Sequence, residues 1–355
     1  MHVPDGFIDA PVSLATGALA AAAVATALRG ARRELDDRAA PLAGLVAAFV
    51  FAVQMLNFPV AAGTSGHLLG GALAAILVGP YTAVLCISVV LLMQGILFAD
   101  GGLTALGVNI TDMGVVTTLV AYGTFRALLV LLPRRRPSVT AASFVAALVS
   151  VPAAACAFTL LYALGGTTDV SLGKVFTAMV GVHVLIGVGE AAITALTVGA
   201  VLAVRPDLVH GARGLVRPLE LRTSPGSPPA PEPVPARTPA PVRRSARRVW
   251  AAGLVTALVC AGGVSYYAST SPDGLEKVAH DKGLDSRTEE HAAKGSPLAD
   301  YQVKDVSDAR ISGGLAGVIG VGATLAAGTG VFLVVRRRRA HAPAPAAEAP
   351  AAGSL

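Results

Sequence analysis

Tyr81 to Phe98 reads YTAVLCISVVLLMQGILF, a run of 18 residues without one charged side chain. An α-helix needs about 20 apolar residues to cross the hydrocarbon core of a bilayer, so this run predicts a membrane span. The rest of the chain has the same character: of 355 residues, 54% are hydrophobic and only 14% are charged. A chain this apolar is predicted to be a polytopic membrane protein and not one soluble domain.

Nine stretches in all are candidate spans. They are Pro11 to Arg29, Pro41 to Asn57, His67 to Gly79, Tyr81 to Phe98, Asn109 to Leu132, Ser138 to Leu164, Lys174 to Val204, Val249 to Ala268 and Ile311 to Val335. The third is short, so we expect a tilted or half-length helix whose ends are covered by protein. The predicted fold class is all-α: a polytopic membrane helix bundle of about seven spans plus a two-span C-terminal hairpin.

A Pro-rich and Arg-rich connection divides the chain into two units. Eight prolines lie within the 17 residues from Pro225 to Pro241, a composition typical of an extended spacer that cannot build a core. We therefore expect a seven-span unit at 1–204, a linker at 205–248, a two-span unit at 249–335 and a disordered tail at 336–355. This layout is that of two polypeptides fused into one.

The distribution of Lys and Arg predicts the orientation in the membrane. Arginines cluster after the first, fifth, seventh and ninth segments, whereas the basic residues of the opposite side lie mostly in the long loop 271–310. The Arg-rich side is expected to be cytoplasmic, which places the N-terminus outside the plasma membrane and the C-terminus inside. The net charge of +6 arises from these flanks, so we expect the lipid bilayer and not nucleic acid as the partner. No basic region precedes the first apolar run, so no cleaved signal peptide is expected.

The first residues, MHVPDGF, could chelate a metal ion. The α-amine of Met1, the backbone nitrogen of His2 and the His2 imidazole can close two fused chelate rings, which leaves one planar position for another imidazole. His67 is the candidate for that position, and a square-planar nitrogen set suits Ni(II) or Cu(II), with Co(II) also compatible. Considered without the other, His2 is an incidental polar residue on a solvated terminus, and His67 is a hydrogen-bonded core residue.

Small residues precede His67 in the sequence AAGTSGH and would let a terminus approach closely. Polar residues near the membrane faces of the neighbouring segments are candidates to orient the two imidazoles. They are Asn57, Gln94, Asp100, Asn109, Thr111 and Asp112. We retain Asn109, Thr111 and Asp112 as candidate supporting residues, although helix capping and interhelical hydrogen bonding explain most such residues.

Two further features leave alternatives open. Glu190 lies well inside the seventh segment, where a carboxylate is costly, and His183 is two helical turns away; the two could line a polar pathway or form a buried hydrogen-bonded pair. The cysteines Cys86, Cys156 and Cys260 lie singly in apolar segments and are expected to be packing residues. No phosphate-binding loop is present, so any energy for transport is expected from another subunit.

The motifs resemble those of a known family. MHVPDGF, TSGHLLGGALAAILVGPY and GGLTALGVNITDMG are similar to the substrate-binding membrane component of energy-coupling-factor transporters for nickel and cobalt, over residues 1–205. SPDGLEKVAHDKG and SPLADY resemble the small PDGLE-type auxiliary membrane subunit that accompanies it. The resemblance implies that Met1, His2 and His67 bind one transported Ni²⁺ or Co²⁺, with no other cofactor. It also implies a transmembrane coupling subunit and a pair of cytoplasmic ATPase subunits.

Two other functions are alternatives. One is a metal-dependent membrane enzyme that uses His2, His67 and Glu190 as a hydrolytic site, although the sequence has no HExxH-type helix and no obvious general base beside the histidines. The other is a metal sensor that binds through His280 and His291 in the loop 271–310. Only the transport component requires a free terminus, and its binding should weaken in acid because the amine and the His2 amide must lose protons. The sequence does not decide between nickel and cobalt.

Overall fold

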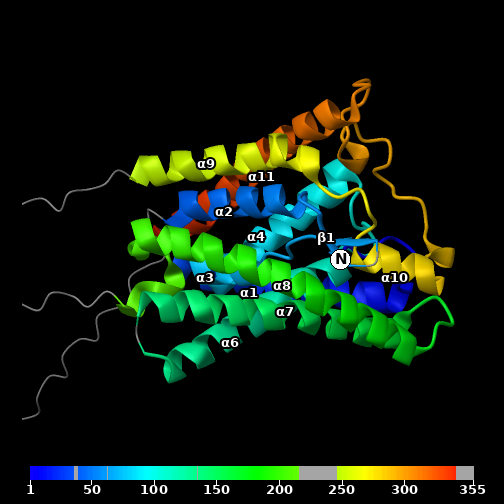
Figure 1. Ribbon diagram of the computed structural model, residues 1–355, viewed down its shortest axis with the longest axis horizontal. Helices are drawn as coiled ribbons and strands as arrows, with labels where there is room; N and C mark the ends of the chain where they lie inside the picture. Colours follow the sequence, from blue (N-terminus) through cyan, green and yellow to red (C-terminus); the bar gives the residue numbers. More distant parts are fainter. Residues whose placement is uncertain (36–38, 62, 134, 216–245, 341–355) are drawn as a thin grey trace, which may run out of the picture.

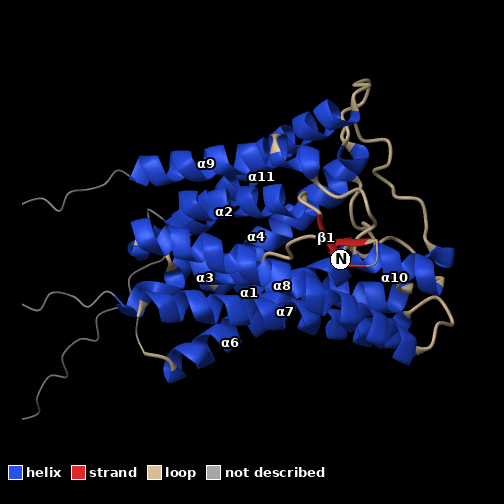
Figure 2. Ribbon diagram, viewed as in Figure 1, coloured by secondary structure: helices blue, strands red, loops and turns tan. Residues whose placement is uncertain are grey.

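The computed structural model describes residues 1–35, 39–61, 63–133, 135–215 and 246–340 as a bundle of roughly parallel and antiparallel helices (Figures 1 and 2). The predicted Pro-rich spacer from Pro225 to Pro241 lies outside these described residues, as do residues 341–355. Residues 336–340, expected in the tail, instead continue the last helix.

The helices follow the apolar segments of the sequence closely. The α-helices are α1 (Ala10–Glu34), α2 (Ala39–Gln54), α3 (Gly71–Val78), α4 (Pro80–Met93), α5 (Leu106–Asn109), α6 (Thr117–Leu131), α7 (Arg136–Gly165), α8 (Leu172–Val204), α9 (Ala246–Gly262), α10 (Gly274–Lys282) and α11 (Ala309–Ala340). Two π-helical segments, Gln94–Phe98 and Ile110–Val116, continue α4 and join α5 to α6. Within the described residues, seven helices are long and apolar enough to cross a membrane, and Ala40–Gln54 is a shorter apolar helix. The all-α prediction is confirmed.

The third predicted segment, His67 to Gly79, is not one helix. A small antiparallel hairpin of β1 (Phe58–Ala61) and β2 (Thr64–Gly66) precedes it, and α3 begins only at Gly71 and has eight residues. Gly70 adopts φ +88°, which interrupts the helix, and a Cβ on Gly71 would lie 2.0 Å from Thr117 Oγ1. The segment therefore enters the bundle as extended chain and completes its path as a half-helix.

Glu190 on α8 accounts for how this half-helix begins inside the bundle. Its carboxylate accepts hydrogen bonds from the backbone N–H of Leu69 at 2.6 Å and of Gly70 at 3.1 Å. The first N–H groups of a helix have no partner within the helix, so a buried N-terminus needs an acceptor of this kind. His183 Nδ1 faces the carbonyl oxygen of Met179 at 2.7 Å, and no hydrogen bond joins it to Glu190 in the described residues. The buried partner of Glu190 is thus backbone, not the His183 ring.

The C-terminal hairpin is packed into the bundle. Helices α9 and α11 lie side by side and both run along α2 (Figure 1). The approach of α11 is close, since a Cβ on Gly320 would lie 2.2 Å from the ring of Phe51. The loop between α9 and α11 contains α10, which packs against α8 at the end of the bundle where the N-terminus lies. Both units therefore meet at that end.

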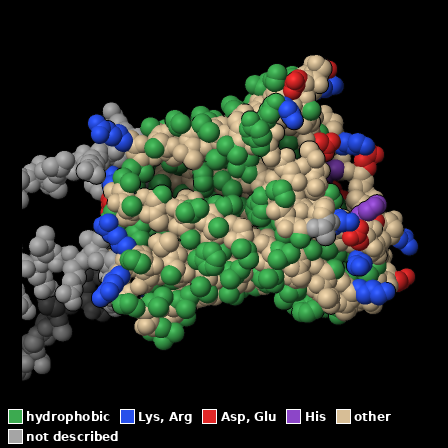
Figure 3. Space-filling model, viewed as in Figure 1, with side chains coloured by type: hydrophobic (Ala, Val, Ile, Leu, Met, Phe, Trp, Pro, Cys, Tyr) green, Lys and Arg blue, Asp and Glu red, His purple; other side chains and the backbone are tan. Residues whose placement is uncertain are grey.

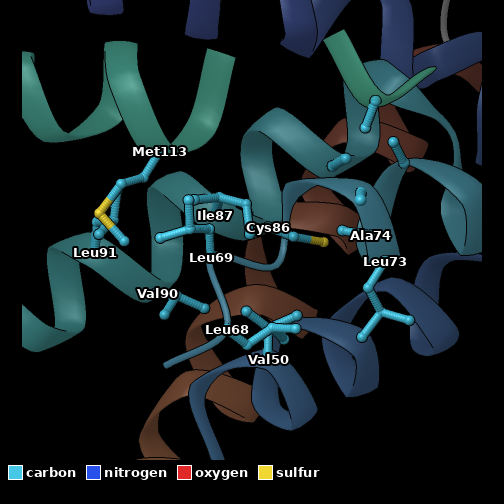
Figure 4. Packing of buried hydrophobic residues seen from close by; sticks show 14 of the residues in the cluster. Val50, Leu68, Leu69, Leu73, Ala74, Cys86, Ile87, Val90, Leu91 and Met113 are labelled. Carbon is cyan, nitrogen blue, oxygen red and sulfur yellow. The ribbon is translucent and has the colours of Figure 1, made fainter. Parts of the chain in front are cut away.

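Apolar side chains occupy both the core of the bundle and its outward-facing surface, as the apolar sequence predicts. The side chains of Leu68 and Leu69 of the extended segment pack among apolar residues of α2, α3 and α4, some of which are shown in Figure 4. Outward-facing residues are also apolar: Leu14, Val130 and Leu196 are 75%, 82% and 74% exposed. Charged side chains gather at the two ends of the visible face, with a hydrophobic band between them (Figure 3). This is the surface of a multi-pass membrane protein.

Candidate metal centre

The N-terminal segment folds back into the protein at Pro4-Asp5-Gly6, a sequence typical of a turn. Gly6 adopts φ +86°, and Met1 is only 2% exposed. Asn109 holds the backbone of Val3 on both sides: its Oδ1 accepts from the Val3 N–H at 2.8 Å, and its Nδ2 donates to the Val3 carbonyl at 3.1 Å. These bonds fix the position of the first two residues and give Asn109 a supporting contact.

The amine of Met1 lies against His67. Its nitrogen is 2.6 Å from His67 Nε2, although 66 positions separate the residues. His67 Nδ1 faces the carbonyl oxygen of Leu68 at 3.0 Å. A carbonyl can only accept, so this contact places the ring proton on Nδ1 and leaves the lone pair of Nε2 directed at the amine. An imidazole nitrogen in this state can serve as a metal ligand.

The His2 ring stacks on the His67 ring, with centroids 5.1 Å apart and an interplanar angle of 23°. Its Nε2 is 3.1 Å from Gln94 Oε1, which accepts the ring proton, and its Nδ1 is 3.3 Å from Asp100 Oδ1. Burial lowers the pKa of His2 to about 4, against the opposing effect of the Asp100 carboxylate. The ring is therefore neutral at neutral pH.

Gln94 and Asp100 are held in turn by Tyr301 from the SPLADY segment. The Tyr301 hydroxyl donates to Asp100 Oδ2 at 2.6 Å and accepts from Gln94 Nε2 at 3.0 Å. The Tyr301 ring stacks on Phe98, with centroids 4.8 Å apart. Gln94 begins the π-helical segment Gln94–Phe98, and Ala99, which follows it, has φ 54°. This irregular backbone brings Gln94 and Asp100 toward His2. Such segments are frequent at functional sites.

Asp273 of the SPDGLE segment also reaches the amine, which the sequence analysis did not foresee. Its Oδ2 lies 2.6 Å from the Met1 nitrogen and 3.3 Å from His67 Nε2. Burial alone would raise the pKa of Asp273, but the amine and the His67 ring outweigh it and hold the pKa well below its usual range. Asp273 is therefore a buried carboxylate anion. The available signal was the Asp-x-x-Glu spacing of a helix capping box.

Single ligand atoms of His2, His67 and Asp273 lie within 4.8 Å of one another. Divalent ions bind nitrogen and oxygen at about 2.0–2.2 Å, so opposite ligands of one ion are about 4 Å apart. A cavity of about 560 Å³ opens beside the three side chains and is lined by residues of both units. The arrangement is compatible with one small cation.

The remaining candidates make no hydrogen bond to His2 or His67 in the described residues, although Asn57 lines the same cavity. Thr111 Oγ1 is 3.5 Å from the carbonyl oxygen of Thr16 on α1, and Asp112 is buried, with neither oxygen hydrogen-bonded in the described residues. His280 is exposed and faces Asp285, whereas His291 Nε2 donates to the carbonyl of Gly101 at 3.1 Å. The structure thus brings together Met1, His2 and His67, with support from Gln94, Asp100 and Asn109.

Family comparisons match both units. Residues 2–208 match the model described as the cobalt uptake substrate-specific transmembrane region, and residues 247–337 match the PDGLE domain. Their boundaries fall on either side of the Pro-rich linker.

Individual relatives agree with these matches. A protein of Haloquadratum walsbyi whose name assigns it to metal transport is 40% identical over 209 residues, 59% of this chain and 93% of its own. The cobalt transport protein CbiM of Sorangium cellulosum is 35% identical over 59% of this chain and 94% of its own. The fused nickel transport protein NikMN of Rhodobacter capsulatus is 43% identical over 34% of this chain and 35% of its own. A crystal structure of a truncated transition-metal transporter superposes with a TM-score of 0.52 and 29% identity, over 57% of this chain and 99% of that one.

Proposed function

Because this chain belongs to the cobalt uptake substrate-specific transmembrane family and carries a PDGLE domain, we propose that it is the substrate-binding membrane component for uptake of Ni²⁺ or Co²⁺. One observation supports this proposal most directly: the Met1 amine lies 2.6 Å from His67 Nε2 in a buried site. Adjacent ligands of one ion that binds nitrogen at about 2.0 Å are about 2.8 Å apart.

The proposed donors are the Met1 amine, the His2 backbone nitrogen, the His2 imidazole and the His67 imidazole. The hydrogen bond of the His67 ring favours this role, because it leaves the lone pair of His67 Nε2 available. His2 Nδ1 is the ring nitrogen that closes a six-membered chelate with the backbone nitrogen of its own residue. Gln94, Asp100 and Asn109 would orient these donors, which is the usual role of residues that bind the ligands of a metal.

The energy for uptake would come from separate subunits. We infer a transmembrane coupling subunit and a pair of cytoplasmic ATPases as partners, because the resemblance to the substrate-binding components of energy-coupling-factor transporters implies them. The Arg-rich loops support an orientation with the N-terminus outside the plasma membrane and the C-terminus in the cytoplasm. In that orientation, the site faces the exterior. The family is a transport family, and a metal-dependent enzyme or a sensor that uses the same histidines is the alternative.

Metal analysis tests this function. The full chain, purified in detergent after exposure to Ni²⁺, Co²⁺ and a large excess of Mg²⁺, is expected to retain one Ni²⁺ or Co²⁺ per chain and no Mg²⁺. Nitrogen donors suit the first two ions, whereas Mg²⁺ prefers oxygen donors and keeps several waters. Mass spectrometry of the bound metal provides the measurement. A chain that leaves the column without either ion would contradict the proposal.

Binding is also expected to weaken in acid. The low pKa of His2, about 4, keeps its ring neutral down to pH 5, so protonation of this ring does not cause the loss. The protons that Ni²⁺ displaces come from the amine and the His2 amide. For each proton released on binding, the affinity falls about tenfold when the pH is lowered by one unit. Titration calorimetry between pH 8 and pH 6 measures this slope. A constant affinity over that range would exclude the amine and the amide as ligands.

A further inference from the structure

The PDGLE domain reaches the site through a segment that is docked rigidly beside His67. Ser65, on the strand before His67, donates from its N–H to the carbonyl of Pro272 at 2.9 Å and from its hydroxyl to the carbonyl of Ser271 at 2.7 Å. Two residues before Ser271, the N–H of Ser269 donates to the carbonyl of Asn57 at 2.7 Å. The segment before Asp273 is therefore bonded to the hairpin that immediately precedes His67 and to Asn57 just before that hairpin.

The first turn of α10 then fixes the direction of the Asp273 carboxylate. Oδ1 accepts from the Glu276 N–H at 2.8 Å, and the Glu276 side chain accepts from the Asp273 N–H at 3.0 Å. This capping box uses one carboxylate oxygen and leaves the other, Oδ2, directed at the Met1 amine and His67. Gly274 permits the approach, since a Cβ there would lie 2.8 Å from Ile186 on α8.

The distances give Oδ2 the position of a ligand atom. It lies as close to the Met1 nitrogen as His67 Nε2 does, 2.6 Å in both cases, and 3.3 Å from Nε2 itself. Resting on the function proposed above, we propose that Asp273 Oδ2 is an additional ligand of the transported ion, so that the PDGLE domain completes the coordination of the site. The ion then has one carboxylate oxygen beside its nitrogen donors.

The Asp273→Asn variant of the full chain tests this assignment. Asparagine is as good a helix N-cap as aspartate, so its side-chain oxygen can still accept from Glu276 while the anionic Oδ2 is lost. We expect the affinity for Ni²⁺ to fall about 10- to 100-fold. We also expect X-ray absorption of the Ni²⁺-loaded protein to show one oxygen neighbour fewer. The matched control is Asp285→Asn, an exposed residue of the same loop, which should bind as the wild type does.

Two outcomes would overturn the assignment. In the first, Asp273→Asn binds Ni²⁺ as tightly as the wild type or more tightly, with unchanged coordination, and Asp273 is then only the ion-pair partner of the amine. In the second, Asp273→Ser, which retains a capping side chain without a carboxylate, binds Ni²⁺ as the wild type does. Failure of the proposed function would look different, because the wild-type chain itself would then not retain the ion.

Discussion

Extension of the chain ahead of Met1 is expected to lower the affinity for Ni²⁺ or Co²⁺ at least about 100-fold. Loss of a residue that only supports a metal ligand costs up to about 100-fold, and loss of a ligand should cost at least as much. A Gly-Ser extension moves the free amine away from His67 Nε2, which it now faces at 2.6 Å, and turns the Met1 nitrogen into an amide. The buried site also has no room for added residues, because Met1 is 2% exposed. Titration of the purified full chain measures the change.

The matched control places the same two residues after Leu355, where they should leave binding unchanged. Circular dichroism and gel filtration establish that both extended chains are folded. Full retention of the ion by the chain extended ahead of Met1 would contradict the amine as a ligand. The His67→Ala variant would then show whether the imidazole acts alone.

Replacement of Glu190 by alanine is expected to destabilise the whole bundle. The carboxylate is the acceptor for the N–H groups of Leu69 and Gly70, and each buried donor left without a partner costs about 1–3 kcal/mol. The sum, roughly 2–6 kcal/mol, is a large part of the stability of a typical protein. The expected result is a much lower melting temperature in detergent and little folded protein.

Two variants separate this structural role from a role in ion conduction. Glu190→Gln retains one acceptor oxygen and should have intermediate stability, whereas Thr177→Ala, at an exposed position of the same helix, should melt as the wild type does. If Glu190 lined an ion pathway, Glu190→Ala would lose uptake and keep its melting temperature. That result would exclude the capping role.

The segments that carry the candidate ligands could be identified from the sequence because their features are local. MHVPDGF contains its own chelating atoms and its own turn, and the structure does place Met1 and His2 beside His67. The supporting residues were less accessible. Among six polar candidates, the sequence analysis retained Asn109, Thr111 and Asp112, yet Gln94 and Asp100 contact the His2 ring. A π-helical turn decides which of these polar residues point inward, and residue periodicity does not predict such a turn.

The backbone path of the third apolar segment, like the choice of supporting residues, could not be predicted from the sequence. Its length indicated a short helix, but the backbone just before the helix start at Gly71 is bonded to Glu190, which lies 120 positions away from Gly70. Apolar character alone does not distinguish a continuous helix from extended chain followed by a half-helix, because both bury the same side chains. The backbone N–H groups must find acceptors, and only the packed bundle supplies one inside the apolar core.

The sequence by itself determined the membrane class, the helical segments and the division into two units, because burial in a bilayer selects runs of apolar residues that can be read locally. Tertiary structure alone decided that Asp273 and Tyr301 of the C-terminal unit lie at the site formed by Met1, His2 and His67. These contacts join residues more than 200 positions apart. Their geometry depends on how α10 packs against α8 and how α11 packs along α2, and no local pattern encodes that packing.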